Sequence, residues 1–445
     1  MKAARTTEHS ERVLLVGIAR GGRAHTFRER LAPDEQPLSE LRELARSAGA
    51  QVTGTVEQRR ERIDPATVVG RGKLEEIKAE ACVRQAPLLI FDCNLTPVQQ
   101  RNIEAATGCR VIDRTQLILD IFARHARSRE GMLQVELAQL NYLLPRLAGR
   151  GVELSRLGAG IGTRGPGEQK LETDRRRIRD RIRKIREGIE KVRRQRAVRR
   201  QARQAVPLGT VALVGYTNAG KSTLFNALTG AEVYISPQMF ATLDPTVRSV
   251  RLPSNRKVLL SDTVGFISDL PPGLIAAFRA TLEEVQEAAL VLHVTDISNP
   301  RHAEQDAEVE KVLAELGVND RPRIHVYNKI DRLAADVRAS LHAGNANVFV
   351  SALEGSGLDE LLQGIDEALP VDRLRRLRLR IPLSEGRTLA LVHGLGRVIQ
   401  AETRDSQMWL EAELPESLVR RLDPRFIQRG AEELTAAAAR TFDQD

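Results

Sequence analysis

The sequence contains few of the residues on which several common protein classes depend. Only three of its 445 residues are cysteines, and they show no CxxC spacing, so neither a disulfide framework nor a thiolate zinc site is expected. The eight histidines are likewise scattered without the spacing of a metal site. No long apolar run predicts a membrane span, and the polar first ten residues do not form a secretory signal. We therefore expect a cytoplasmic protein with no membrane span.

Aromatic side chains make up 3% of the chain and are not interleaved with its basic residues. Because single-stranded nucleic acids are bound by stacking bases on aromatic rings, this scarcity argues against that mode of binding. Positive charge, by contrast, is concentrated. Residues 174–203 hold fifteen Lys and Arg against four Asp and Glu, a net charge of +11. The whole chain carries +9, so the other residues sum to −2 and all net basicity lies in this segment.

The basic segment is expected to be helical, because isoleucines recur at four-three spacing between residues 178 and 189. A leucine series of the same spacing at residues 133–147 predicts the other arm of an antiparallel hairpin. The glycine-rich residues 149–167 between them form either a flexible linker or a loop that probes a partner. A run of charge is usually a solvated face, but few glutamates stand at i+4 here, so we favour contact with phosphates of folded RNA. The candidate RNA-binding residues are Arg193, Arg194, Arg196, Arg199 and Arg200.

A phosphate-binding loop is the most informative feature of the chain. Residues 215–222 match the P-loop pattern, directly after an apolar strand-like run and before a helix-forming stretch. In such a loop the backbone N–H groups and the helix N-terminus surround the phosphates. Lys221 then reaches the β- and γ-phosphates, and the Ser222 hydroxyl ligates Mg²⁺. The predicted nucleotide-binding residues here are Gly215, Tyr216, Thr217, Asn218, Ala219, Gly220, Lys221 and Ser222.

A second motif indicates which base is bound. Asn328, Lys329, Ile330 and Asp331 follow the apolar run 324–327, and ligands of open α/β sheets bind at such strand ends. A carboxylate there can accept two hydrogen bonds from guanine, whereas adenine offers no such pair of donors. Ser351, Ala352 and Leu353 follow another strand-like run and would support the same base. A P-loop ATPase or kinase remains the alternative, and it requires Asp331 to be incidental.

Two further segments match nucleotide-sensing switches. Asp262, Thr263, Val264 and Gly265 end a strand-like run, where the Asp would position the Mg²⁺ shell and the Gly would meet the γ-phosphate. The first switch is expected at Phe240, Ala241, Thr242, Leu243 and Asp244. Thr242 is our candidate for the second Mg²⁺ hydroxyl, ahead of Thr246.

Phe266 stands where small GTPases carry the glutamine that orients the attacking water. It either merely packs or marks a hydrophobic-substituted GTPase that is activated by a partner. We favour the second interpretation, and no residue of the chain is assigned as catalytic.

The predicted fold class is α/β, in four parts. A small α/β domain (1–114) precedes a helical hairpin with a glycine-rich loop and a basic helix (115–205), a P-loop GTPase domain (206–370) and a small α+β domain (371–445).

Together these motifs resemble the HflX family of GTPases, of the translation-factor class. The most specific part of the resemblance is the stretch Gly-Ile-Gly-Thr-Arg-Gly-Pro-Gly-Glu before the basic helix. The resemblance implies binding to the large ribosomal subunit and its RNA, GTP hydrolysis to GDP stimulated by the ribosome, and action on stalled or idle ribosomes, including subunit splitting. It also implies that Phe266 is a family trait and that Ser222 and Thr242 hold Mg²⁺. We expect a monomer. The alternative is an RNA-binding module whose nucleotide site only regulates affinity.

Overall fold

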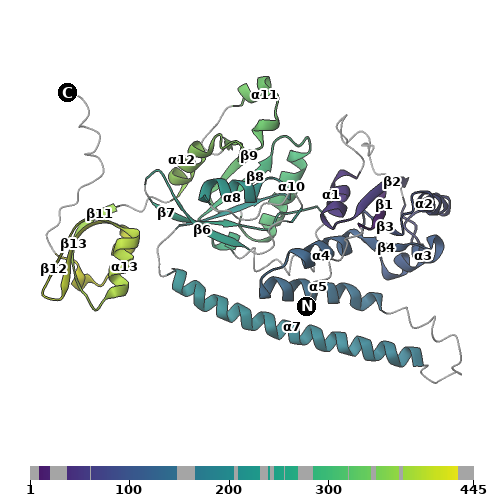
Figure 1. Cartoon of the computed structure of the whole chain (residues 1–445), viewed down its shortest axis with the longest axis horizontal. Helices are drawn as coiled ribbons and strands as arrows, with labels where there is room; N and C mark the ends of the chain where they lie inside the picture. Colours follow the sequence, from purple (N-terminus) through teal and green to yellow (C-terminus); the bar gives the residue numbers. More distant parts are fainter. Residues whose placement is uncertain are drawn as a thin grey trace, which may run out of the picture.

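The computed structural model describes most of the chain. The described residues are 10–20, 38–60, 62–147, 166–204, 209–230, 239–240, 245–254, 256–268, 284–318, 320–341, 347–369 and 374–428. They form two parallel sheets with helices, a pair of long helices, and a three-stranded C-terminal sheet (Figure 1). The predicted α/β class is confirmed.

The N-terminal domain is a four-stranded parallel sheet with the order β2-β1-β3-β4. Strand β3 is buried along its whole length, which explains its uninterrupted apolar sequence. A capping box at Thr96 and a proline at the first turn fix the start of α3. The strands are β1 (Arg12–Arg20), β2 (Gln51–Arg60), β3 (Leu88–Phe91) and β4 (Arg110–Asp113); the helices are α1 (Ser39–Ser47), α2 (Arg71–Val83), α3 (Pro97–Thr107) and α4 (Arg114–His125).

Helices α5 (Arg129–Arg146) and α7 (Pro166–Gln204) lie side by side, as the hairpin prediction requires (Figure 1). They are antiparallel, since Arg181 of α7 pairs with Glu136 while Gly188, further along α7, approaches Leu133. The isoleucines at 182, 185 and 189 are buried on α7, as predicted. On α5 the predicted leucine face is only half-buried. The buried apolar side chains of α5 are instead Val135 and Ala138, which join the core of the N-terminal domain.

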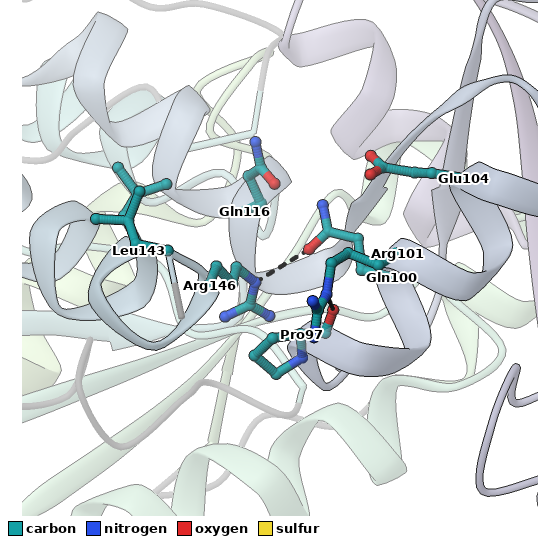
Figure 2. Close-up of a pocket in the computed structure, with 8 residues that line it drawn as sticks. Pro97, Gln100, Arg101, Glu104, Gln116, Leu143 and Arg146 are labelled. Atoms are coloured by element: carbon teal, nitrogen blue, oxygen red, sulfur yellow. Dashed lines mark hydrogen bonds between the residues drawn. The ribbon is translucent and has the colours of Figure 1, made fainter. Parts of the chain in front are cut away.

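The far end of α5 is fastened to the N-terminal domain by one arginine. Arg146 donates to the Gln100 side chain at 3.1 Å (Figure 2), to the Leu95 carbonyl at 2.7 Å and to Asp113 at 3.0 Å. Its guanidinium also lies 3.4 Å from the ring centre of Tyr142. The small hollow beside it in Figure 2 is lined by this arginine together with Arg101, Glu104 and Gln116.

The GTPase domain contains a six-stranded sheet with the order β10-β9-β8-β5-β7-β6, in which only β6 runs antiparallel to its neighbour. The strand before the P-loop, β5, therefore lies inside the sheet, between β7 and β8. After β5 the chain first adds β6 and β7 on one side and then β8, β9 and β10 on the other, so the strand order reverses at β5. This is where open α/β sheets bind ligands. Its strands are β5 (Gly209–Gly215), β6 (Thr246–Arg251), β7 (Lys257–Asp262), β8 (Leu290–Asp296), β9 (Arg323–Asn328) and β10 (Asn347–Phe349); its helices are α8 (Lys221–Thr229), α10 (His302–Glu315), η1 (Ile330–Arg332), α11 (Ala335–Ala339) and α12 (Leu358–Ala368).

The C-terminal module is an antiparallel sheet, β11-β13-β12, with one face buried by helices. Its elements are β11 (Leu374–Pro382), α13 (Gly386–Leu395), β12 (Arg397–Arg404), β13 (Gln407–Pro415), α14 (Glu416–Val419) and η2 (Pro424–Phe426). These agree with the predicted α+β pattern. None of the helices in the described ranges is both long and apolar enough to cross a membrane.

Candidate nucleotide-binding site

The P-loop of this chain has glycine at the two points where the backbone is most crowded. Gly215 has φ 151°, and a Cβ built there would lie 2.1 Å from the carbonyl oxygen of Val294. Gly220 has φ 90°, and its Cβ would lie 2.2 Å from Nδ2 of Asn328. Any side chain at either position would therefore break the approach of the loop to β8 and to the base-recognition motif.

Lys221 begins helix α8 and is buried under the loop. Its ammonium donates to the carbonyls of Tyr216 at 2.7 Å and Gly215 at 3.1 Å. Burial lowers the pKa of Lys221 to about 8, partly opposed by the nearby carboxylate of Asp262. An anionic ligand would supply the charge that this buried cation lacks, which is the electrostatic arrangement expected of a phosphate site.

The Ser222 hydroxyl donates to the Asp262 carboxylate at 2.7 Å, so the P-loop and the end of β7 meet as predicted. Asp262 is fully buried. A hydroxyl and a carboxylate are hard oxygen donors, and this donor set fits Mg²⁺ rather than a metal that prefers nitrogen or sulfur.

The segment after β7 is hydrogen-bonded to the P-loop by its backbone. The Thr217 amide donates to the Phe266 carbonyl at 2.7 Å, and the Phe266 amide donates to Gly215 at 3.1 Å. A Cβ at Gly265 would lie 2.9 Å from Thr217 and 3.0 Å from the Lys221 ammonium. Gly265 therefore lies directly against the Lys221 ammonium, where a side chain would not fit without displacing a neighbour.

The predicted base-recognition motif, residues 328–331, is held by a set of cross-loop hydrogen bonds. Asn328 donates to the Ala219 carbonyl of the P-loop at 2.9 Å and accepts from the Ala352 amide at 3.0 Å. Lys329 donates to the Asn218 carbonyl and to Asp296, each at 2.6 Å. One asparagine thus joins three loops that are far apart in the sequence.

Asp331, the residue predicted to read guanine, is positioned by a hydroxyl. Its Oδ1 accepts from Ser351 Oγ at 2.6 Å. Ser351 is fully buried, whereas Leu353 in the same motif is 80% exposed. Ile330 is buried, and its amide donates to Val350 at 3.3 Å. The structure therefore brings the P-loop, residues 328–331 and residues 351–352 together at one edge of the sheet.

Comparison with known proteins identifies the family to which this chain belongs. Three family models match in succession: "GTP-binding GTPase N-terminal" at residues 35–123, "GTP-binding GTPase Middle Region" at 125–203 and "50S ribosome-binding GTPase" at 210–329. The protein named GTPase HflX from Caldanaerobacter subterraneus is 49% identical, over 87% of this chain and 90% of its own length. GTPase HflX from Escherichia coli K12 is 43% identical, over 86% of this chain and 90% of its own. The chain belongs to the HflX family of GTPases.

The predicted enzyme class, hydrolysis of GTP to GDP and phosphate, is confirmed by this membership. Among solved structures, a GTP-binding protein from Sulfolobus solfataricus in complex with GDP is 24% identical, with a TM-score of 0.43 over 80% of this chain and 98% of its own. P-loop GTPases in general bind their nucleotide with Mg²⁺.

The predicted first switch lies largely outside the described residues, and this includes Ala241, Thr242, Leu243 and Asp244. Phe240 is described. It has φ 61° and is buried, and its ring packs edge-on against Phe122 with 4.5 Å between ring centroids. Its side chain thus contacts the N-terminal domain, which the sequence did not predict. Whether Phe240 also serves the nucleotide stays a prediction.

Phe266 is buried in the same core cluster as Phe240. Its side chain has no polar atom. Because the ring is packed in the core, it fixes the Phe266 backbone groups that form hydrogen bonds with the P-loop. Both interpretations of Phe266 are compatible with this geometry, since the ring packs and it also leaves no side-chain amide to orient water.

Tyr216 connects the P-loop to the N-terminal domain, a role that the motif did not reveal. Its hydroxyl donates to Glu40 of α1 at 3.1 Å, lies 2.5 Å from the Ser268 hydroxyl and accepts from the Ser268 amide at 2.9 Å. Arg114 bonds to the same Glu40 and donates to the Ser268 carbonyl at 3.4 Å. The N-terminal domain is therefore hydrogen-bonded both to the P-loop and to the segment that follows Gly265. A cavity of about 350 Å³ lies at this junction.

Among the predicted RNA-binding residues, the described side chains are those of Arg193 and Arg194. Arg193 pairs with Glu190 at 2.8 Å within α7, and Arg194 is exposed. Arg196, Arg199 and Arg200 lie on α7, but their side chains are outside the described set. Other arginines of α7 also pair with acids, yet fifteen basic residues outnumber four acidic ones between 174 and 203. An excess of positive charge therefore remains on this helix.

Proposed function

We propose that this protein binds the large ribosomal subunit and there hydrolyses GTP, acting on stalled or idle ribosomes to split or rescue them. The observation that carries the proposal is the pairing, in one chain, of a GTPase domain matched by a "50S ribosome-binding GTPase" family with a hairpin whose basic helix has a net charge of +11 between residues 174 and 203. A ribosomal surface is largely RNA phosphate, which such a helix would attract.

In this proposal the nucleotide site consists of residues 215–222, 240–244, 262–265, 328–331 and 351–353. Ser222 and Thr242 would ligate Mg²⁺, which would neutralise charge on the phosphates, and Lys221 would hold the β- and γ-oxygens. Asp331 would accept from guanine, in line with its fixed position beside Ser351. Arg193, Arg194, Arg196, Arg199 and Arg200 would contact ribosomal RNA.

Hydrolysis would depend on the partner. Phe266 offers no group to orient water, so the ribosome or a rearranged switch would have to do so. We further propose a cytoplasmic monomer in the four parts 1–114, 115–205, 206–370 and 371–445, in which α4, at the start of the second part, packs on the N-terminal sheet.

Steady-state GTP hydrolysis with and without large ribosomal subunits tests the central claim. Strong stimulation is expected. An unchanged slow rate with ribosome binding intact would favour the second candidate, an RNA-binding module whose nucleotide site only sets affinity.

The basic helix is tested separately by replacing Arg193, Arg194, Arg196, Arg199 and Arg200 with Glu. Ribosome binding should be lost while GTP binding is kept, because the substitutions lower the net charge of residues 174–203 from +11 to +1 and leave the P-loop residues unchanged. A matched control replaces exposed arginines of the C-terminal sheet, Arg378 and Arg404, by Glu. If ribosome affinity and its salt dependence stayed unchanged in the α7 variant, α7 would not be the contact.

A further inference from the structure

Two histidines lie side by side on the GTPase sheet. His293 on β8 and His325 on β9 are direct partners in the parallel register, so their side chains project from the same face of the sheet. Their ring centroids are 5.0 Å apart. In the sequence they are separated by a helix and two loops, which is why histidine spacing alone predicted no metal site.

Helix α10 supplies an acidic side chain to this pair. Glu310 Oε1 lies 3.4 Å from Nδ1 of His293. One potential ligand atom from each of His293, Glu310 and His325 falls within 4.8 Å of the other two. Two imidazoles and one carboxylate are the donor set of late first-row divalent cations such as Zn²⁺, and they suit Mg²⁺ poorly.

His293 is prepared for ligation by the residue on its other side. The side chain is fully buried, and Nε2 lies 3.3 Å from the Asp306 carboxylate, which also accepts from Thr295 at 2.6 Å. A carboxylate at Nε2 favours the tautomer with its proton there, and this leaves the Nδ1 lone pair directed toward Glu310.

The ring nitrogens themselves make no hydrogen bond of acceptable geometry. This holds for both nitrogens of His293 and for Nδ1 of His325 among the described residues. Because Nε2 faces the Asp306 carboxylate, the Nδ1 lone pair is the atom of this buried imidazole that most needs a partner, and a bound cation would supply one.

We propose that His293, Glu310 and His325 form a binding site for a late first-row divalent cation such as Zn²⁺, with Asp306 as the residue that orients His293. The cation would cross-link α10 to β8 and β9, three residues before these strands end at Asp296 and Asn328 in the nucleotide edge. Arg323 bonds to the Glu310 carboxylate and competes with the cation for it. We therefore expect a micromolar rather than a very tight site.

The test is calorimetric titration of the chelator-treated full-length chain with Zn²⁺ in excess Mg²⁺, repeated with Co²⁺ while recording its absorption spectrum. One equivalent should bind. His325→Gln should weaken binding by about 100-fold or more, since even outer-shell residues of metal sites are worth ~10–100-fold. His393→Gln, on the exposed surface of α13, is the matched control and should bind as the parent does.

Arg323→Gln sharpens the test because it should tighten binding by removing the competing cation, an effect that a purely structural histidine cluster does not produce. Glu310→Gln, at a half-exposed helix position, serves if His325→Gln fails to fold, and should show a similar loss. Absence of one-to-one binding, equal binding by His325→Gln and His393→Gln, or a thiolate-to-cobalt charge-transfer band that assigns the metal to cysteine would each overturn the proposal.

Discussion

The two parallel sheets of this protein both carry aspartates where their strands end, but the two sets of aspartates have different partners. In the N-terminal sheet, Asp113 accepts from two backbone amides and from Arg146, and Asp92 pairs with Arg114. In the GTPase sheet, Asp262 meets the hydroxyl of Ser222, beside a lysine at a helix N-terminus.

The difference shows that sheet topology provides a position for a site and that the neighbouring side chains decide its use. At the N-terminal edge, arginines neutralise the aspartates, and these ion pairs hold helices and domains together. At the GTPase edge, hydroxyls, glycines and a buried lysine leave room and positive potential for a phosphate.

The largest effect should come from removing the cation of the N-terminal edge. Arg114→Gln would leave Glu40 and Asp92 without their buried partner and should lower the free energy of unfolding by about 3–5 kcal/mol. Urea denaturation followed by circular dichroism measures it. The control, Arg110→Gln, breaks an exposed pair with Glu11 and should cost under ~1 kcal/mol. Equal losses in the two variants would contradict the assignment of Arg114 as the neutralising residue.

Removing the cation of the GTPase edge should instead affect ligand binding. Lys221→Ala should weaken GTP binding by about 100-fold or more through loss of charge-assisted contacts, while leaving stability unchanged or higher because a buried ammonium is removed. Fluorescent-nucleotide titration and urea denaturation give the two values. Lys257→Ala, on an exposed position of β7, is the matched control. If the Lys221→Ala variant bound GTP normally, the P-loop would not be part of the nucleotide-binding site.

A smaller change tests the base. Asp331→Asn replaces the predicted acceptor pair by an amide, so GTP affinity should fall by about 10–100-fold and xanthine nucleotides should gain. Competition binding with the two nucleotides measures the switch. Asp336→Asn, exposed in α11, should change neither. Unchanged GTP affinity in Asp331→Asn would refute guanine recognition by this residue.

The smallest loss of stability should come from removing the Tyr216 hydroxyl, which connects the P-loop to the N-terminal domain. Tyr216→Phe deletes the hydroxyl shared by Glu40 and Ser268 and should lower the free energy of unfolding by about 1–2 kcal/mol, with GTP affinity within ~2-fold of the parent. Tyr327→Phe, on β9, is the control for loss of a tyrosine hydroxyl. If Tyr216→Phe lost nucleotide binding instead, its hydroxyl would belong to the site rather than to the domain contact.

Much of the candidate nucleotide-binding site was predictable from the sequence, because its motifs are short stretches of consecutive residues. The P-loop, Asp262 and the Asn328–Asp331 motif each follow an apolar strand, and strand ends in one sheet meet at one edge. The isoleucine face of α7 was also read correctly from its spacing.

The contacts that were missed join residues distant in the sequence. The Tyr216–Glu40 bond and the Phe122–Phe240 pair depend on how two domains dock, and neither residue type nor spacing encodes that. The His293–His325 pair depends on strand order, because β8 and β9 become neighbours only in the folded sheet. The α5 leucines are half-buried because α5 packs on two sides, which a single periodic stripe cannot express.

Helix α7 has a mechanical consequence that follows from its length. Its 39 residues form one continuous rod of about 58 Å at 1.5 Å per residue, and the rod ends five positions before the strand that leads into the P-loop. A tilt of about 5° at that end would carry the other end through about 5 Å. A helix of this length, packed along α5, would convert a small tilt at one end into a displacement of several ångströms at the other.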